Sequence, residues 1–171
     1  MKVAIIGYSG CGKSTLASTI ARENNVPLLH LDKVHWIPGW IERPEEQEKK
    51  IIREFMDKND SWVIDGNYHS LEYSRRMEEA DRIIFLAFPR LICLARAWRR
   101  ARKYRGKTRS SMAEGCPEKL DAEFVLWILH EGRTRKIQEN YKRIMLKYGD
   151  KAVKIHNQKE LDEERRKWMK H

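Results

Sequence analysis

Hydrophobic residues follow two different periods along this chain, and the two periods alternate from one end to the other. Short apolar runs bounded by Gly, Pro, Asn or Asp predict buried strands. Apolar residues that recur every three or four positions, as in the segment 51–56, predict amphipathic helices between these strands. The expected strands are residues 2–6, 28–32, 61–65, 82–88 and 152–155. The expected helices are residues 14–23, the segment after Pro44, residues 71–80, the segment after Pro89, residues 118–147 with an interruption at Gly132, and the charged C-terminal segment.

This alternation predicts an α/β fold, with a five-stranded parallel sheet flanked by helices in three layers. No linker or repeat divides the chain, so residues 1–171 are expected to form a single domain. Two stretches follow neither period. Residues 106–117 should be a loop. Trp36 and Trp40 flank Pro38 and Gly39 in a second expected loop, where the two rings either line a substrate pocket or pack in the core.

The charge of the chain is concentrated in one segment. The 171 residues carry a net charge of +10, and 35% of them are charged. Residues 82–113 hold ten basic residues and no acidic one, so the rest of the chain is electrically balanced. The bases are Arg82, Arg90, Arg96, Arg99, Arg100, Arg102, Lys103, Arg105, Lys107 and Arg109. Such a segment suits an anionic partner, which can be a nucleic acid, a membrane surface or a phosphorylated small molecule.

Composition excludes several other classes of protein. No apolar stretch approaches the roughly 20 residues that span a bilayer. The apolar run near the N-terminus is too short for a signal peptide, so a cytoplasmic protein without a membrane partner is expected. Cys11, Cys93 and Cys116 show no C-x-x-C spacing, which argues against a zinc site or a disulfide framework and favours buried thiols.

The strongest motif is GYSGCGKS at residues 7–14, which matches G-x-x-x-x-G-K-[ST] in full between an expected strand and an expected helix. Its glycines let backbone N–H groups surround phosphate oxygens, and the helix N-terminus adds positive charge. Lys13 would reach the β- and γ-phosphates, and the Ser14 hydroxyl would ligate Mg²⁺. The residues expected to bind the nucleotide are Gly7, Ser9, Gly10, Cys11, Gly12, Lys13, Ser14 and Thr15. The motif predicts a P-loop NTPase that uses ATP and Mg²⁺.

Two aspartates should lie near this loop, because the carboxyl ends of parallel strands meet at one edge of the sheet. Asp65 ends the strand SWVID, where a carboxylate can hold Mg²⁺ directly or through water; it can equally be a turn residue before Gly66. Asp32 ends the expected strand 28–32 and can accept a proton from a substrate hydroxyl, or it can be a capping or ion-paired residue.

The chain resembles the FlaR-type topology modulation proteins, which are small adenylate-kinase-like P-loop proteins of the nucleoside and nucleotide kinase group. The resemblance covers nearly the whole chain. The residues that carry it are GYSGCGKST (7–15), HLD (30–32), PGW (38–40), SWVIDGNY (61–68), RMEEADRIIFL (76–86), YRGKTR (104–109), MAEGCPEK (112–119), and WIL with GRTR (127–135). The chain departs from adenylate kinase itself by reading DGNYH at 65–69 and by lacking a four-cysteine zinc lid, which weakens the case for AMP as the acceptor.

The resemblance implies a mobile lid after the fourth strand, here near residues 104–120, and arginines that clamp the transferred phosphoryl group. On the matching positions these are Arg96 or Arg100 before the lid, Arg105 and Arg109 within it, and Arg133 and Arg135 beyond it. Together with Lys13 and Asp32, the residues Arg96, Arg105, Arg109 and Arg133 form the expected catalytic set.

Two active functions remain open on the sequence, beside a third interpretation as a non-catalytic nucleotide sensor. The first is an ATP-dependent phosphotransferase (kinase) whose acceptor is a small molecule such as a nucleoside or nucleotide. The second is a nucleic-acid-binding ATPase that modulates DNA topology, with nucleic acid held by residues 82–113. The absence of a recognised DNA-reading motif favours the first.

Overall fold

The centre of the molecule is a parallel sheet whose first strand lies in the middle. In the computed structural model, which describes residues 1–169, the five strands follow the order β2-β5-β1-β6-β7. They are β1 (Lys2–Gly7), β2 (Leu28–His30), β5 (Trp62–Asp65), β6 (Arg82–Leu86) and β7 (Ala152–Ile155). Ile5 of β1 pairs with Asp65 of β5 on one side and with Ile84 of β6 on the other. The expected parallel sheet is confirmed.

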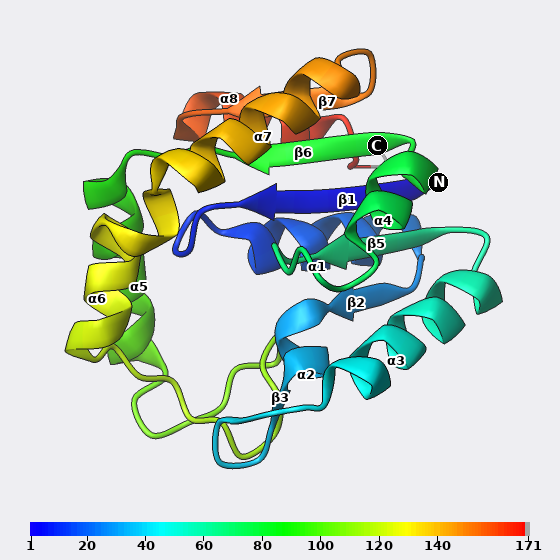
Figure 1. Cartoon of the computed structure of the whole chain (residues 1–171). Helices are drawn as coiled ribbons and strands as arrows, with labels where there is room; N and C mark the ends of the chain where they lie inside the picture. The colour runs from blue at the N-terminus through cyan, green and yellow to red at the C-terminus, as the bar shows by residue number, and fades with distance from the viewer. Residues whose placement is uncertain (170–171) are drawn as a thin grey trace.

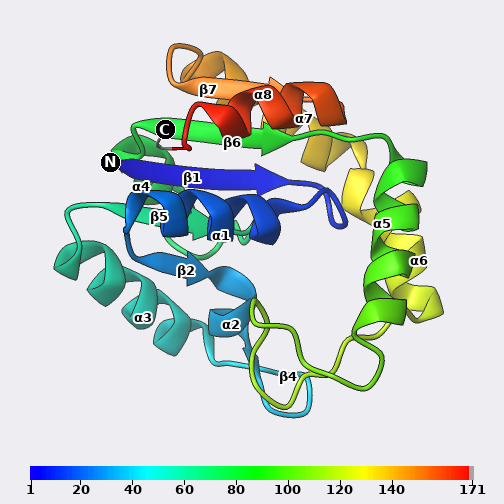
Figure 2. The ribbon, with the colours of Figure 1, turned by 180° about the vertical axis from the view of Figure 1, so that it is seen from behind.

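Helices cover both faces of this sheet, and the fold therefore has three layers (Figures 1 and 2). One face is covered by α1 (Lys13–Asn24) and α8 (Gln158–Arg166), whereas α5 (Arg90–Lys103) lies beyond the carboxyl ends of the strands (Figures 1 and 2). A buried cluster that includes Leu16, Ala97 and Phe88 joins this face to α5. The other face is covered by α3 (Glu45–Lys58), α4 (Tyr73–Glu79) and α7 (Arg135–Lys147), through a cluster that includes Ile52 and Met77. The expected α/β class is confirmed.

The expected strand over 28–32 ends two residues early. β2 stops at His30, and Leu31 begins the short helix α2 (Leu31–His35), so Asp32 lies in the first turn of a helix instead of at a strand end. The prediction of a loop around Trp36 and Trp40 was also incomplete. A hairpin of β3 (Trp36–Ile37) and β4 (Ile41–Glu42) forms there, because Gly39 and Trp40 adopt positive φ angles of 87° and 62° and turn the chain sharply.

The expected long helix over 118–147 is two helices. α6 (Ala122–Leu129) begins at Asp121, whose side chain accepts a hydrogen bond from the backbone N–H of Phe124. A single 3₁₀ turn, η1 (Glu131–Arg133), then leads into α7. A Cβ atom on Gly132 would lie 2.9 Å from the Trp127 carbonyl oxygen, so this close turn requires glycine. The interruption at Gly132 is confirmed, whereas the start at residue 118 was too early.

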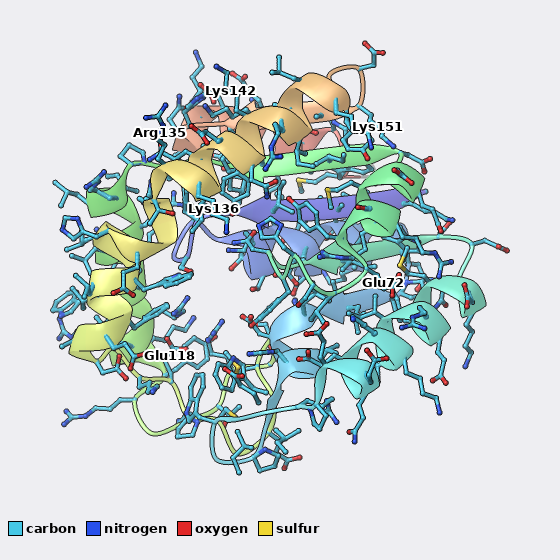
Figure 3. All side chains as sticks on the ribbon, in the orientation of Figure 1. Glu72, Glu118, Arg135, Lys136, Lys142 and Lys151 are labelled. Carbon is cyan, nitrogen blue, oxygen red and sulfur yellow. The ribbon has the colours of Figure 1, made fainter. Side chains whose placement is uncertain are left out.

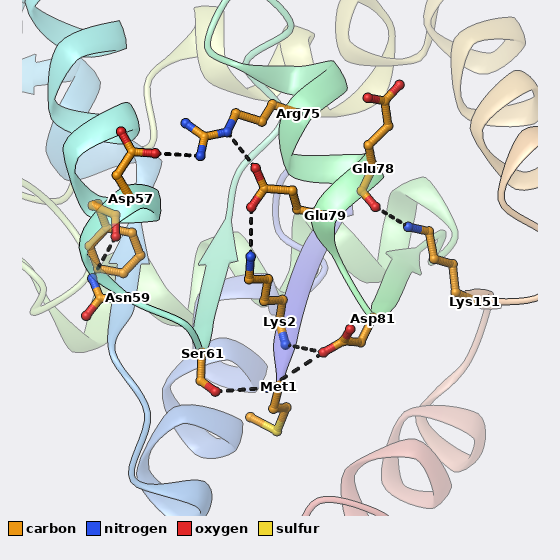
Figure 4. A network of polar contacts seen from close by, with 11 residues as sticks. Met1, Lys2, Asp57, Asn59, Ser61, Arg75, Glu78, Glu79, Asp81 and Lys151 are labelled. Carbon is orange, nitrogen blue, oxygen red and sulfur yellow. Dashed lines mark hydrogen bonds and ion pairs between the residues drawn. The ribbon is translucent and has the colours of Figure 1, made fainter.

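A network of polar contacts ties together the N-terminal ends of the strands, opposite the glycine-rich loop (Figure 4). The N-terminal amino group donates to Ser61 Oγ at 2.9 Å, and Lys2 Nζ pairs with Glu79 at 2.8 Å. The backbone N–H of Lys2 donates to Asp81 at 2.7 Å. These contacts hold β1 to the segments before β5 and β6. Within residues 1–169, every helix is too short or too polar to cross a bilayer.

Candidate nucleotide and acceptor site

The loop between β1 and α1 has the backbone shape that phosphate binding requires. Gly10 and Gly12 have φ angles of 81° and 96°, which only glycine adopts without strain. A Cβ atom on Gly10 would lie 2.4 Å from the Cys93 carbonyl oxygen, so the loop also packs tightly against α5. No side chain caps the N-terminus of α1 at Gly12. The first N–H groups of this helix are therefore available to an anion, and the loop fits a nucleotide phosphate.

Lys13 lies across this loop. Its Nζ donates to the carbonyl oxygens of Gly7 at 2.9 Å and Tyr8 at 3.1 Å. The Gly7 backbone is held from the other side by Asn67, whose side-chain amide both accepts from the Gly7 N–H and donates to the Gly7 carbonyl. Lys13 is thus placed inside the loop, where it can exchange two carbonyl contacts for phosphate oxygens.

Asp65 lies at the carboxyl end of β5, where it is almost fully buried and hydrogen-bonded to Nδ1 of His30 at the end of β2. The other nitrogen of His30 is 3.5 Å from Ser18 Oγ, one turn of α1 beyond Ser14. Ser14 and Asp65 therefore belong to neighbouring elements at one edge of the sheet, and their hydroxyl and carboxylate oxygens are ligands that suit Mg²⁺. In the described part of the chain no group of three or more His, Cys, Asp or Glu forms a metal site of its own.

Asp32 faces the same edge from α2. The Tyr68 hydroxyl donates to its Oδ1 at 2.9 Å. Burial and the neighbouring Asp32 carboxylate raise the pKa of Tyr68 far above its usual value, so Tyr68 remains a proton donor to Asp32. The pKa of Arg100 is lowered by burial and by the nearby Arg109, and the Glu118 carboxylate opposes that shift, with a smaller effect from the Asp32 carboxylate. Asp32 is thus held by Tyr68 just beyond the carboxyl end of β2.

Glu118 joins Arg100 and Arg109. Its carboxylate, only 4% exposed, accepts from Arg100 Nε at 2.7 Å and from Arg109 Nε. Arg109 also donates to Ser111 Oγ at 2.9 Å, and the Glu118 backbone N–H donates to the Lys107 carbonyl. A buried carboxylate thus holds together two guanidinium groups, one from α5 and one from residues 104–120, the expected lid, at the position labelled in Figure 3.

The lid segment contacts the β3–β4 hairpin. The Gly39 N–H donates to the Gly115 carbonyl at 3.1 Å, and the Cys116 thiol donates to the Ile37 carbonyl at 3.3 Å. A hollow of about 720 Å³ lies between the two segments. Its lining includes Lys33, Trp36, Arg43, Arg109, Ser110 and Glu114. Trp36 therefore forms part of the wall of this hollow. The centre of its ring also lies 5.4 Å from the centre of the Trp40 ring.

Arg96 and Arg133 support the glycine-rich loop from behind. Arg96 donates to the Cys11 carbonyl at 2.7 Å and to Gln158 at 2.7 Å. Arg133 donates to the Phe88 carbonyl at 2.9 Å and lies 3.8 Å from the centre of the Tyr8 ring. These contacts make both arginines part of the support of the loop, so any contact with a phosphoryl group would require them to change partners.

The remaining predicted residues are more exposed. Arg105 is exposed in the segment 104–120. Arg135 is exposed at the start of α7, where it pairs with Glu139, and lies beyond the end of α6 that is farther from Glu118 (Figure 3). Ser9 accepts a hydrogen bond from Trp127 Nε1 at 3.2 Å, and Thr15 is exposed on α1. The structure brings Arg100 and Arg109 together on Glu118. It places Lys13, Ser14, Asp32 and Asp65 on segments at or just after the carboxyl ends of β1, β2 and β5.

Four residues of the site were missed from the sequence as contributors: His30, Asn67, Tyr68 and Glu118. The segments HLD, SWVIDGNY and MAEGCPEK contain them. However, no spacing rule connects Tyr68 with Asp32, or Glu118 with Arg100, because their partners come from different elements.

Substituting Glu118 with glutamine should destabilise the protein by about 2 kcal/mol, because two partly buried guanidinium groups would lose their shared counter-charge. Hydrogen exchange in residues 104–120 should become faster, which mass spectrometry can measure. Glu114→Gln is the matched control, since Glu114 is an exposed acid of the same segment. Equal exchange in the two variants would show that Glu118 does not hold the lid.

Comparisons with known proteins agree with this architecture. A family model described as "ATPase family associated with various cellular activities (AAA)" matches residues 3–85, slightly less than half of the chain. No curated protein matches the sequence.

Among solved structures, shikimate kinase from Acinetobacter baumannii in complex with shikimate superposes with a TM-score of 0.57 at 17% identity, covering 97% of this chain and 89% of that one. Shikimate kinase from Bacteroides thetaiotaomicron gives a TM-score of 0.50 at 18% identity, covering 98% and 95%. At such low identity these matches concern the fold. The chain therefore has the α/β fold of these structures, with its glycine-rich loop at the carboxyl end of β1.

Proposed function

We propose that this protein is an ATP- and Mg²⁺-dependent phosphotransferase that acts on a small molecule carrying a hydroxyl group. The proposal rests on three observations: Lys13 lies in the P-loop, Tyr68 holds Asp32 just beyond the end of β2, and Glu118 holds Arg100 and Arg109 together. A simple ATP-binding protein needs only the first of these groups. Phosphoryl transfer to an acceptor additionally requires an acid–base residue and positive charge for the transferred group, which Asp32 and the arginine pair would supply.

Each group has a distinct task in this reaction. The loop N–H groups and Lys13 would bind the β- and γ-phosphates of ATP, and Ser14 and Asp65 would hold Mg²⁺, which neutralises phosphate charge. Asp32, held by Tyr68, would accept the proton of the acceptor hydroxyl as it attacks. Arg100 and Arg109 would stabilise the charge on the transferred group, because guanidinium forks match phosphoryl oxygens. The lid would exclude water that otherwise hydrolyses ATP.

The hollow beside the lid favours an acceptor with its own negative charge. Its lining contains three basic residues, Lys33, Arg43 and Arg109, and one acidic residue, Glu114. Trp36 adds an aromatic wall. A nucleotide, or another hydroxylated anion, fits this lining better than an uncharged nucleoside.

The test is transfer from ATP labelled on the γ-phosphate to a panel of nucleosides, nucleotides, sugars and hydroxylated carboxylates. Acceptor-dependent transfer, with a preference for anions, would support the proposal. A protein that binds ATP but transfers label to no member of a broad panel would contradict it.

Substituting Asp32 with asparagine should reduce transfer by about two to three orders of magnitude, since proton acceptance by a positioned base contributes that much. ATP affinity should stay within a factor of two, because Asp32 serves the acceptor. Asp57→Asn is the control, since Asp57 is an exposed carboxylate that pairs with Arg75. An equal loss of ATP affinity would reassign Asp32 to the metal.

The finer parts of the proposal follow from the resemblance to the FlaR-type topology modulation proteins. We propose that residues 1–171 form one kinase-like domain, with a lid near 104–120, in a cytoplasmic protein. Arg96, Arg105 and Arg133 remain proposed contributors to the clamp, provided that lid movement brings them to the phosphoryl group.

The alternative of a nucleic-acid-binding ATPase rests on the surface of α5. Trp98 is 51% exposed, and the Arg102 guanidinium lies 4.7 Å from its ring centre, beside the exposed Arg99 and Lys103. Such a surface suits stacking on bases and contact with phosphates. This function requires tight DNA binding with a steep salt dependence, because each neutralised phosphate releases counter-ions. Weak binding at physiological salt, measured by fluorescence anisotropy, would exclude it.

A further inference from the structure

Two cysteines that are far apart in the sequence touch each other directly behind the P-loop. Cys11 belongs to the loop, and Cys93 lies in the first turn of α5. Their Sγ atoms are 3.2 Å apart, and both side chains are completely buried. The third cysteine, Cys116, is elsewhere, in the lid, where it donates to a carbonyl oxygen. The pair is therefore a contact that the tertiary structure creates between two free thiols.

The surroundings favour loss of a proton from one of these thiols. The Cys93 thiol, the positive charge of Lys13 and that of Arg133 all lower the pKa of Cys11, to about 7 against the opposing effect of burial. The Cys11 sulfur and burial raise the pKa of Cys93. Arg133 Nη2 also lies 3.2 Å from Cys93 Sγ. The Cys11 sulfur thus has thiolate character, and the Cys93 sulfur is a protonated thiol in contact with it.

We propose that Cys11 and Cys93 form a modification site at which hydrogen peroxide produces an intramolecular disulfide that fastens the P-loop to α5. In the first step the Cys11 thiolate attacks peroxide, so that an S–O bond forms and the O–O bond breaks. The departing hydroxide takes up the proton that Cys11 released when it ionised, and leaves as water. In the second step Cys93 sulfur attacks Cys11 sulfur. The S–S bond forms, the S–O bond breaks, and a second water carries away the Cys93 proton. Two thiols are oxidised and one peroxide is reduced to two waters.

The bond would act on nucleotide binding through the loop backbone. A disulfide is about 1 Å shorter than the present sulfur contact. Cys11 must therefore move toward α5, although its carbonyl is held by Arg96 and its neighbour Gly10 already touches the Cys93 backbone. The phosphate-binding N–H groups would be displaced from their positions. We expect the oxidised protein to bind ATP several-fold more weakly.

The experiment treats the full-length protein with increasing hydrogen peroxide and follows intact mass, peptide maps and binding of a fluorescent ATP analogue. The expected product is lighter by two hydrogen atoms, contains a Cys11–Cys93 peptide pair, binds the analogue several-fold more weakly, and recovers fully with dithiothreitol. Cys116→Ser should behave as the wild type. Cys93→Ser should yield Cys11 sulfenic or sulfinic acid and no disulfide.

Several results would overturn the proposal. Oxidation that stops at sulfinic acid on Cys11 in the wild type would show that Cys93 does not react. A disulfide that includes Cys116 would assign the reactivity to another site. A Cys11–Cys93 disulfide that leaves the affinity for the analogue unchanged would refute the predicted coupling to the P-loop. None of these readouts requires the acceptor, so they do not depend on the proposed transferase activity.

Discussion

Replacing Lys13 with alanine should lower the turnover of ATP by about two to three orders of magnitude while the protein stays folded. Within residues 1–169, Lys13 Nζ hydrogen-bonds to the Gly7 and Tyr8 carbonyl oxygens alone and takes part in no ion pair. Its removal therefore costs little in stability. In the reaction, by contrast, its charge would stabilise the phosphate oxygens most strongly in the transition state, and alanine offers nothing in its place.

The measurement is the release of labelled phosphate or its transfer to an acceptor, combined with urea unfolding and ATP titration. Lys58→Ala is the matched control, because Lys58 is an exposed lysine at the end of α3. Turnover in Lys13→Ala equal to that in Lys58→Ala would refute the role of the P-loop lysine. Loss of turnover together with unfolding would instead assign Lys13 a structural role.

Replacing Arg76 with methionine should destabilise the protein by about 3 kcal/mol or more. Arg76 is completely buried and donates to the carbonyl oxygens of Leu71, Gly66 and Tyr68. Burial lowers its pKa to about 10, so enclosing this charge has a cost that methionine would remove. However, three carbonyl groups would lose their donor, at roughly 1–3 kcal/mol each, and this larger effect should prevail.

The loss of Arg76 should also disturb the hydrogen bond between Tyr68 and Asp32, because the three carbonyl groups belong to the turn that positions Tyr68. Arg75→Met is a closely matched control. Arg75 is a neighbour on the same helix, but it lies at the surface, where it pairs with Asp57 and Glu79 (Figure 4). Surface pairs of this kind contribute about 1 kcal/mol or less. Equal unfolding free energies for the two variants, measured in urea, would contradict the role given to Arg76.

The fold could be predicted from the sequence because its signals are local. Each buried strand appears as an apolar run, each amphipathic helix as a period of three to four, and the P-loop as a contiguous motif. The predicted element boundaries were wrong where the backbone turns of a few residues decide where a strand ends. Asp32 was assigned to a strand end, because the apolar run LLHL continues past His30, where the backbone already turns into α2. The hairpin at Trp36–Glu42 depends on positive φ angles that no apolar pattern reveals.

The arginines show more clearly what cannot be predicted from the sequence, namely the partner of each charged side chain. Ten bases stand in one uninterrupted segment, and composition treats them alike. In the structure these bases have different partners. Arg96 holds the P-loop backbone, and Arg100 and Arg109 share Glu118. The Arg102 guanidinium lies over the ring of an exposed tryptophan. The excess charge is therefore partly used inside the molecule, and the rest lies on the outer surface of α5.

The sequence by itself determined the order of the elements, the parallel sheet and the position of the phosphate loop, because periodicity and backbone conformation depend on neighbouring residues. Only the tertiary structure decided which side chains meet. Tyr68 with Asp32, Glu118 with two arginines, and Cys11 with Cys93 are contacts between elements that the chain brings together from distant positions. Burial then gives these pairs their chemistry, since a carboxylate, guanidinium or thiol removed from water depends on the one partner that it contacts.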